Sequence, residues 1–180
     1  EELSNSELLP QLKALTRLVN LPEGEAGFDD RQAMNELVAR YILALGDVRK
    51  SASLAESIRQ NFGFAARSTG GMPNPEVIWR TLLISAKAAL AEKDDIAALN
   101  FLDQAIDVMN SISSADGTST QATADKLELY RIAIETAYRR WKNSSSDVDA
   151  AILWKYVEGM KSRQWREMLS GSGVAFLDRM

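Results

Sequence analysis

The stretch Trp79–Met109, WRTLLISAKAALAEKDDIAALNFLDQAIDVM, decides the fold class of this chain of 180 residues. Apolar residues recur at helical spacing on both sides of its polar centre. They are Leu82, Ala86 and Ala89 before the centre, and Ala98, Leu102 and Ala105 after it. Alanines at matched heights let two antiparallel helices approach closely. The stretch therefore predicts two packed helices that meet at a tight turn over 92–94, with Ala98 and Ala105 buried.

The same periodicity continues on both sides of this central pair. Only 4 prolines and 10 glycines occur, and they cluster between the periodic stretches, which favours helices over short strands. Gly46 is a natural helix stop, and Ser170–Gly173 should end the last helix at Leu169. The pattern predicts an all-α chain with helices over 6–19, 30–45, 47–66, 75–91, 94–112, 121–142 and 147–169. After the N-terminal helix, we expect three antiparallel pairs separated by long loops.

The absent residue types exclude most catalytic chemistry. With no cysteine and no histidine, the chain has no thiolate nucleophile, no imidazole base and no ligand of either kind for a metal. A carboxylate enzyme would need two facing acids in a closed pocket with separated pKa values. Asp103 and Asp107 lie instead on a predicted solvent face, and Asp94 lies at a helix start, where acids are favoured. We expect no enzyme, no cofactor and no metal.

The charge is unevenly distributed along the chain. Residues 1–125 carry 11 basic and 18 acidic side chains, and residues 126–180 carry 10 basic and 7 acidic. A pI near 5.0 argues against a nucleic-acid partner. No apolar run approaches the roughly 18 residues of a membrane span, and no N-terminal signal is visible, so we expect a cytoplasmic protein without membrane contact.

The alternation of small and large residues in the central pair resembles the tetratricopeptide repeat (TPR). Its fingerprint appears here as Leu82, Ala86, Ala89, Ala98, Leu102 and Ala105. The other pairs keep the layout without the fingerprint, and the long loops exceed the regular repeat length of about 34 residues. The resemblance implies a short TPR-like α-solenoid of about three helix pairs plus an N-terminal helix. We expect residues 1–180 to be one such domain, taken from a longer protein.

The last predicted helix carries a second resemblance. Glu158, the triplet Lys161-Ser162-Arg163 and the triplet Glu167-Met168-Leu169 are similar to the final repeat helix before the caspase-like domain of CHAT proteins, although Trp165 stands where leucine is usual. That family implies an adjoining domain of the same polypeptide as a partner. Its catalytic histidine and cysteine would lie outside this chain.

A TPR-like scaffold implies a protein–protein interaction module that holds a partner segment or docks an adjoining domain. The predicted partner-binding residues are Arg80, Lys87, Arg131, Glu135, Tyr138, Lys161, Arg163, Trp165 and Arg166. The alternative is a purely structural helical domain that mediates homotypic assembly, and the oligomeric state stays open. All four tryptophans are expected in the core, and an exposed one would indicate a docking surface.

Overall fold

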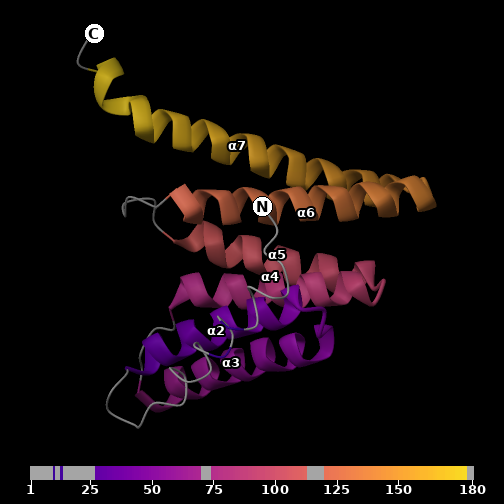
Figure 1. Ribbon diagram of the computed structural model, residues 1–180. Coiled ribbons are helices and arrows are strands. Elements are labelled where there is room, and N and C mark those ends of the chain that lie inside the picture. The colour runs from indigo at the N-terminus through magenta and orange to yellow at the C-terminus, as the bar shows by residue number, and fades with distance from the viewer. Residues whose placement is uncertain (1–9, 11–12, 14–26, 70–73, 113–119, 178–180) are drawn as a thin grey trace. The chain divides into compact units, whose positions relative to one another are not determined.

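The computed structural model describes residues 10, 13, 27–69, 74–112 and 120–177 (Figure 1). Within these residues lie six α-helices and no strand, so the predicted all-α class is confirmed. The helices are α2 (Phe28–Ala44), α3 (Val48–Thr69), α4 (Pro75–Ala91), α5 (Asp95–Ser111), α6 (Thr120–Ser144) and α7 (Asp147–Leu177). Apart from the helical Pro10 and Lys13, the helix predicted over 6–19 lies outside the described residues.

The chain divides into two compact units, Glu1–Ser113 and Ser114–Met180. In the first unit, α2 pairs with α3 and α4 pairs with α5, while α2 and α3 both contact α4. The two helix pairs of this unit are therefore stacked, as consecutive pairs are in an α-solenoid. The second unit contains the hairpin of α6 and α7, which contact each other over the first part of α7, whose later part diverges from α6 (Figure 1).

The tight turns of the first unit share one geometry, as the sequence indicated. Gly46 after α2 and Lys93 after α4 both adopt left-handed backbone conformations, with φ of 85° and 64°. In each turn the next residue, Asp47 or Asp94, donates its backbone N–H to a carbonyl of the preceding helix, at 3.1 and 2.9 Å. This pattern is the Schellman motif. Lysine is strained in a conformation that glycine adopts freely.

The helix starts are fixed by side-chain caps. Asn74 accepts a hydrogen bond from the backbone N–H of Glu76 at 3.0 Å, and Pro75 occupies the first helical position of α4. Asp94 accepts one from the N–H of Ala97 at 2.9 Å. With these caps, α4 starts at its predicted position, and α5 starts within one residue of its own predicted position.

The predicted end of the last helix is wrong. The chain stays helical through Ser170–Gly173, and α7 ends at Leu177 instead of Leu169. A glycine inside a helix costs only about 1 kcal/mol relative to alanine, so a short run of glycine and serine does not by itself stop a helix.

The core of the first unit confirms the predicted small-residue packing. Ala98 and Ala105 are fully buried, and so is Trp79, whose indole N–H donates to Glu76 at 3.0 Å. Two apolar clusters join the pairs: Ala39, Ala55 and Ile84 form one, and Ile58, Phe62 and Val77 form the other. The core also includes Gln32 and Glu36 of α2, which are polar and buried.

Candidate interaction surface

The hairpin of α6 and α7 is held at its turn by a buried carboxylate. Asp149 accepts hydrogen bonds from Arg140 Nε at 2.6 Å and from Ser144 Oγ at 2.5 Å. The hydrogen bond from Ser144, with the hydrogen bond and charge of Arg140, lowers the pKa of Asp149 although burial opposes the shift. Asp149 is thus ionised at neutral pH, and it ties the first turn of α7 to the last turn of α6.

A second contact fixes the spacing of the two helices farther along. A Cβ atom on Gly159 of α7 would lie 3.0 Å from Cε1 of the buried Tyr130 ring on α6. The absence of a side chain at Gly159 is therefore what lets Tyr130 pack against α7. The contacts Arg140–Asp149 and Tyr130–Gly159 have the same antiparallel register, which places Trp154 level with Glu135.

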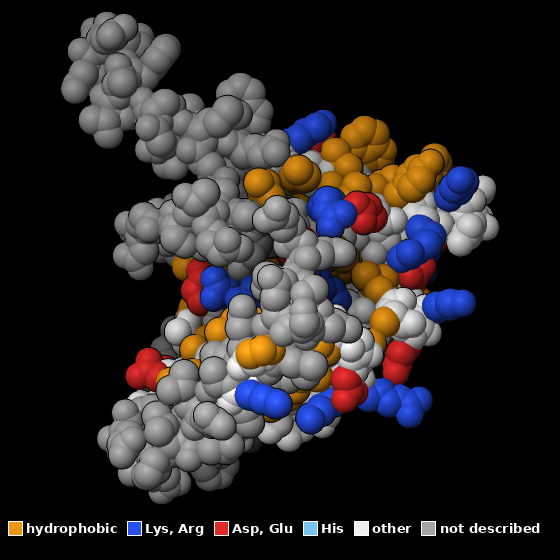
Figure 2. Space-filling view, viewed as in Figure 1, with side chains coloured by type: hydrophobic (Ala, Val, Ile, Leu, Met, Phe, Trp, Pro, Cys, Tyr) orange, Lys and Arg blue, Asp and Glu red, His pale blue; other side chains and the backbone are white. Residues whose placement is uncertain are grey.

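Three aromatic side chains of this hairpin are exposed, and we call them the aromatic surface. Tyr138 and Trp141 of α6 expose 48% and 38% of their surface, and Trp154 of α7 exposes 61%. The rings of Tyr138 and Trp141 lie 5.9 Å apart. Figure 2 shows hydrophobic side chains gathered over the described part of α7 and over α6, with Lys and Arg side chains beside them. The expectation that Trp141 and Trp154 belong to the core is wrong, because both lie on the solvent side of their helices.

The environment of Trp154 is charged. Lys161 Nζ lies 5.9 Å from the centroid of the Trp154 ring, within the range of a cation–π interaction, and it also pairs with Glu158 at 3.2 Å. Trp154, Glu158 and Lys161 follow one another at helical spacing along α7. An exposed indole is thus set into a small polar network.

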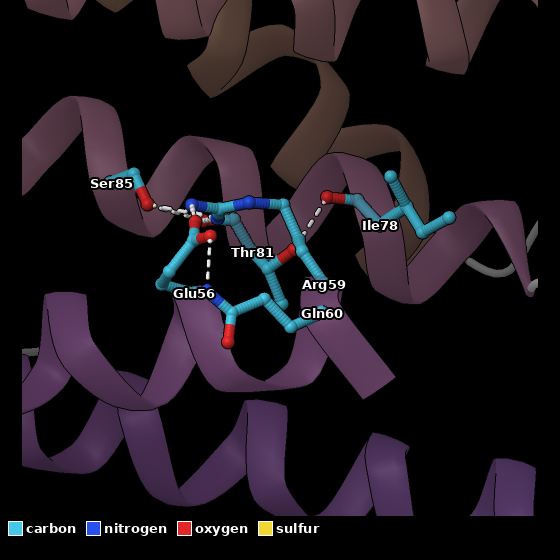
Figure 3. Close-up of polar contacts among 6 residues, drawn as sticks. All are labelled: Glu56, Arg59, Gln60, Ile78, Thr81 and Ser85. Atoms are coloured by element: carbon cyan, nitrogen blue, oxygen red, sulfur yellow. Dashed lines mark hydrogen bonds and ion pairs between the residues drawn. The ribbon is translucent and has the colours of Figure 1, made fainter. Parts of the chain in front are cut away.

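In the first unit, the main polar cluster is centred on Arg59 of α3 (Figure 3). Its Nη1 donates to the carbonyl of Thr81 at 3.2 Å and to Ser85 Oγ at 3.0 Å, both on α4. Nη2 pairs with Glu56, and the guanidinium lies 5.7 Å from the centroid of the Phe101 ring on α5. The Arg59 side chain is mostly buried, and its donors are used within the chain. The cluster therefore joins three helices instead of forming an open binding site.

The residues predicted on α4 are partly covered by their own helix. Arg80 is half-buried, pairs with Glu76 at 3.5 Å, and lies 5.3 Å from the centroid of the Trp79 ring. Lys87 is also half-buried. The side chains of α4 from Thr81 to Ala86 are all buried, so this helix offers little surface to a partner.

The predicted residues on α6 and α7 are more accessible. Arg131 and Glu135 are exposed and form an ion pair at 2.8 Å, and Tyr138, three residues after Glu135, is also exposed. Lys161 is exposed beside Trp154. The structure thus places Tyr138 beside Trp141 and Lys161 beside Trp154, and neither tryptophan was predicted as a site residue. Their sequence signal is weak, because a tryptophan at helical spacing usually indicates a core position.

Three further predicted residues, Arg163, Trp165 and Arg166, lie outside the part of the chain whose side chains are described. Among the described residues, no group of acids could hold a metal ion, and no helix is long and apolar enough to cross a membrane.

The chain matches no known protein family, and no curated protein or solved structure is similar to it. The resemblances to the tetratricopeptide repeat and to the CHAT-associated helix therefore stay predictions that rest on the residues quoted for them.

Proposed function

We propose that this chain is a protein–protein interaction module, a TPR-like helical scaffold that binds a partner through the aromatic surface of the α6–α7 hairpin. The observation that carries the proposal is the exposure of Trp154, at 61% of its surface. Tryptophan and tyrosine are enriched among the residues that dominate binding energy, because they bury a large rigid surface at little entropic cost.

The proposal is supported by the rigidity of the hairpin that presents these rings. Arg140, Ser144 and Asp149 fix the turn, and Tyr130 packs against Gly159 at van der Waals distance. A surface whose backbone is already ordered loses less entropy when it binds. The exposed pair Arg131–Glu135 would then contribute orientation more than affinity, since it is solvated and paired in the free chain.

The partner would be a segment of another protein. An adjoining domain of the same polypeptide is the alternative, as the CHAT resemblance implies. Catalysis by the chain itself is not part of the proposal, since the sequence holds no histidine or cysteine and the acids at Asp94 and Asp149 have structural partners.

Partner binding by single-residue variants tests the proposal. Trp154→Ala removes the exposed indole, and Ile96→Ala is the matched control, because Ile96 is 68% exposed on α5. Proteins captured by the parent chain are purified, and their Kd for each of the three proteins is measured by calorimetry. We expect Trp154→Ala to weaken binding at least tenfold, or about 1.4 kcal/mol, and Ile96→Ala to leave it unchanged. Equal binding by all three proteins would refute the proposed site.

A further inference from the structure

The charge around the aromatic surface is opposite in sign to that of the chain. The whole chain has a formal net charge of −4, whereas residues 138–162 hold five basic and three acidic side chains. One of these acids, Asp149, is buried against Arg140. Lys142 lies one helical turn beyond Tyr138 and is exposed, and Lys161 stands over the Trp154 ring. The exposed aromatic rings therefore have a positively charged border.

Apolar side chains lie beside Trp154 on α7. Leu153 and Val157 are half-buried on α7, within about 100° of Trp154 around the helix axis. A ligand on this surface would contact indole and aliphatic groups at its centre and ammonium groups at its edge. Such an arrangement complements a peptide that presents a large apolar residue among carboxylates.

We propose, on the basis of the proposed function, that the aromatic surface binds an acidic peptide segment with at least one large apolar side chain. The apolar residue packs against Trp154, and neighbouring aspartates or glutamates face Lys142 and Lys161. The ammonium groups attract the carboxylates of the peptide both in direct contact and at long range. Because salt screens this attraction, binding becomes weaker as salt is added.

Two other occupants fit the charges less well. A symmetric dimer through the same surface would set Lys142 and Lys161 of both copies against each other, which like charges disfavour. A nucleic acid would need a denser row of basic side chains than the exposed Lys142 and Lys161 provide. Both remain outcomes of the test.

The test selects peptides from a random library displayed on phage, with the full 180-residue chain as bait. Enriched peptides are synthesised, and their Kd is measured by fluorescence anisotropy. The proteins compared are the parent chain, Trp154→Ala, the double variant Lys142→Glu with Lys161→Glu, and the control Ile96→Ala. Circular dichroism checks that each variant folds, and the mutated side chains are all exposed.

We expect the enriched peptides to combine aspartate or glutamate with a large apolar residue. Trp154→Ala and the double charge reversal should each weaken binding at least tenfold, and raising the salt from 50 to 300 mM should weaken it in the parent but much less in the charge-reversed variant. Ile96→Ala should bind as the parent does.

Other results would overturn the inference in distinguishable ways. Enriched peptides that are basic or uncharged, or that bind Trp154→Ala with full affinity, would refute the acidic ligand at this surface. If binding of the enriched peptides depends on Arg80 or Lys87 instead, the chain is still an interaction module, but the acidic ligand on the aromatic surface is refuted. If no peptide is enriched and no protein partner is captured, both proposals fall. Trp154-dependent binding of a 20-nucleotide RNA, or a Trp154-dependent dimer in light scattering, would replace the peptide with that occupant.

Discussion

Gly159 gives the sharpest test of the hairpin geometry. Replacing a glycine in the middle of a helix with alanine normally stabilises the helix by about 1 kcal/mol. At Gly159 the added Cβ would lie 3.0 Å from Tyr130 Cε1, closer than the 3.5–4.0 Å at which carbon atoms attract most strongly. Because Tyr130 is buried, its ring has little room to move. Overpacking of this kind costs about 1–3 kcal/mol, so Gly159→Ala should destabilise by about 0–2 kcal/mol in total.

The assay is urea unfolding followed by circular dichroism, with a double-mutant cycle. In a Tyr130→Leu background the clash is removed, so Gly159→Ala should stabilise by about 0.5–1 kcal/mol relative to that background. Gly63→Ala in α3 is the control, because a Cβ there has no neighbour within 4 Å and should stabilise by a similar amount. If Gly159→Ala stabilises the parent chain as much as Gly63→Ala does, the close approach of α6 and α7 has been misjudged.

Three further predictions follow from single residues. Lys93→Gly should raise the free energy of unfolding by about 1 kcal/mol, because Lys93 has a φ of 64°; a lower urea midpoint would contradict the strain. Ala98→Leu should cost about 1–3 kcal/mol by overpacking, and a melting temperature equal to the parent's would show that the α4–α5 contact is loose. Because the pKa of Asp149 is lowered in the folded chain, its ionised carboxylate stabilises the fold at pH values above the ordinary aspartate pKa of about 4. This stabilisation is lost as the pH falls through the lowered pKa. Asp149→Asn should therefore destabilise at pH 7 and have a smaller effect at pH 3 in urea titrations, whereas an equal effect at both would refute the role of its charge.

Local signals in the sequence predicted much of the fold. Asn74-Pro75 marked the start of α4, and Gly46 marked the end of α2, because caps and left-handed turns depend on residues within a few positions. The likeness between the Gly46 and Lys93 turns was also visible in the sequence, and the structure confirms it. The burial of Ala98 and Ala105 followed from helical spacing alone.

Contacts between distant segments were not predictable in this way. Arg59 binds Thr81 and Ser85, more than 20 residues away, and nothing near Arg59 in the sequence indicates those partners. The spacing of Ser146 and Asp149 is typical of a capping box, yet the Asp149 carboxylate binds Arg140 and Ser144.

The exposed side chains of the α6–α7 hairpin were predicted in part. Arg131, Glu135, Tyr138 and Lys161 were selected as polar positions of α6 and α7, and all four are exposed. Trp154 was assigned to the core because hydrophobicity alone predicts burial. Its exposure depends on which side of α7 packs against α6, and that side is set by Tyr130, Gly159 and Asp149 together.

The central claim, that the α6–α7 hairpin is the docking surface, is tested most directly by NMR chemical-shift mapping of a bound peptide or partner segment. We expect the largest shift changes on the indole N–H signals of Trp141 and Trp154 and on the backbone amides around Tyr138 and Lys161. The signal of the buried Trp79 indole should stay in place. Shift changes centred on α2 to α5, with those of Trp141 and Trp154 unaltered, would contradict it.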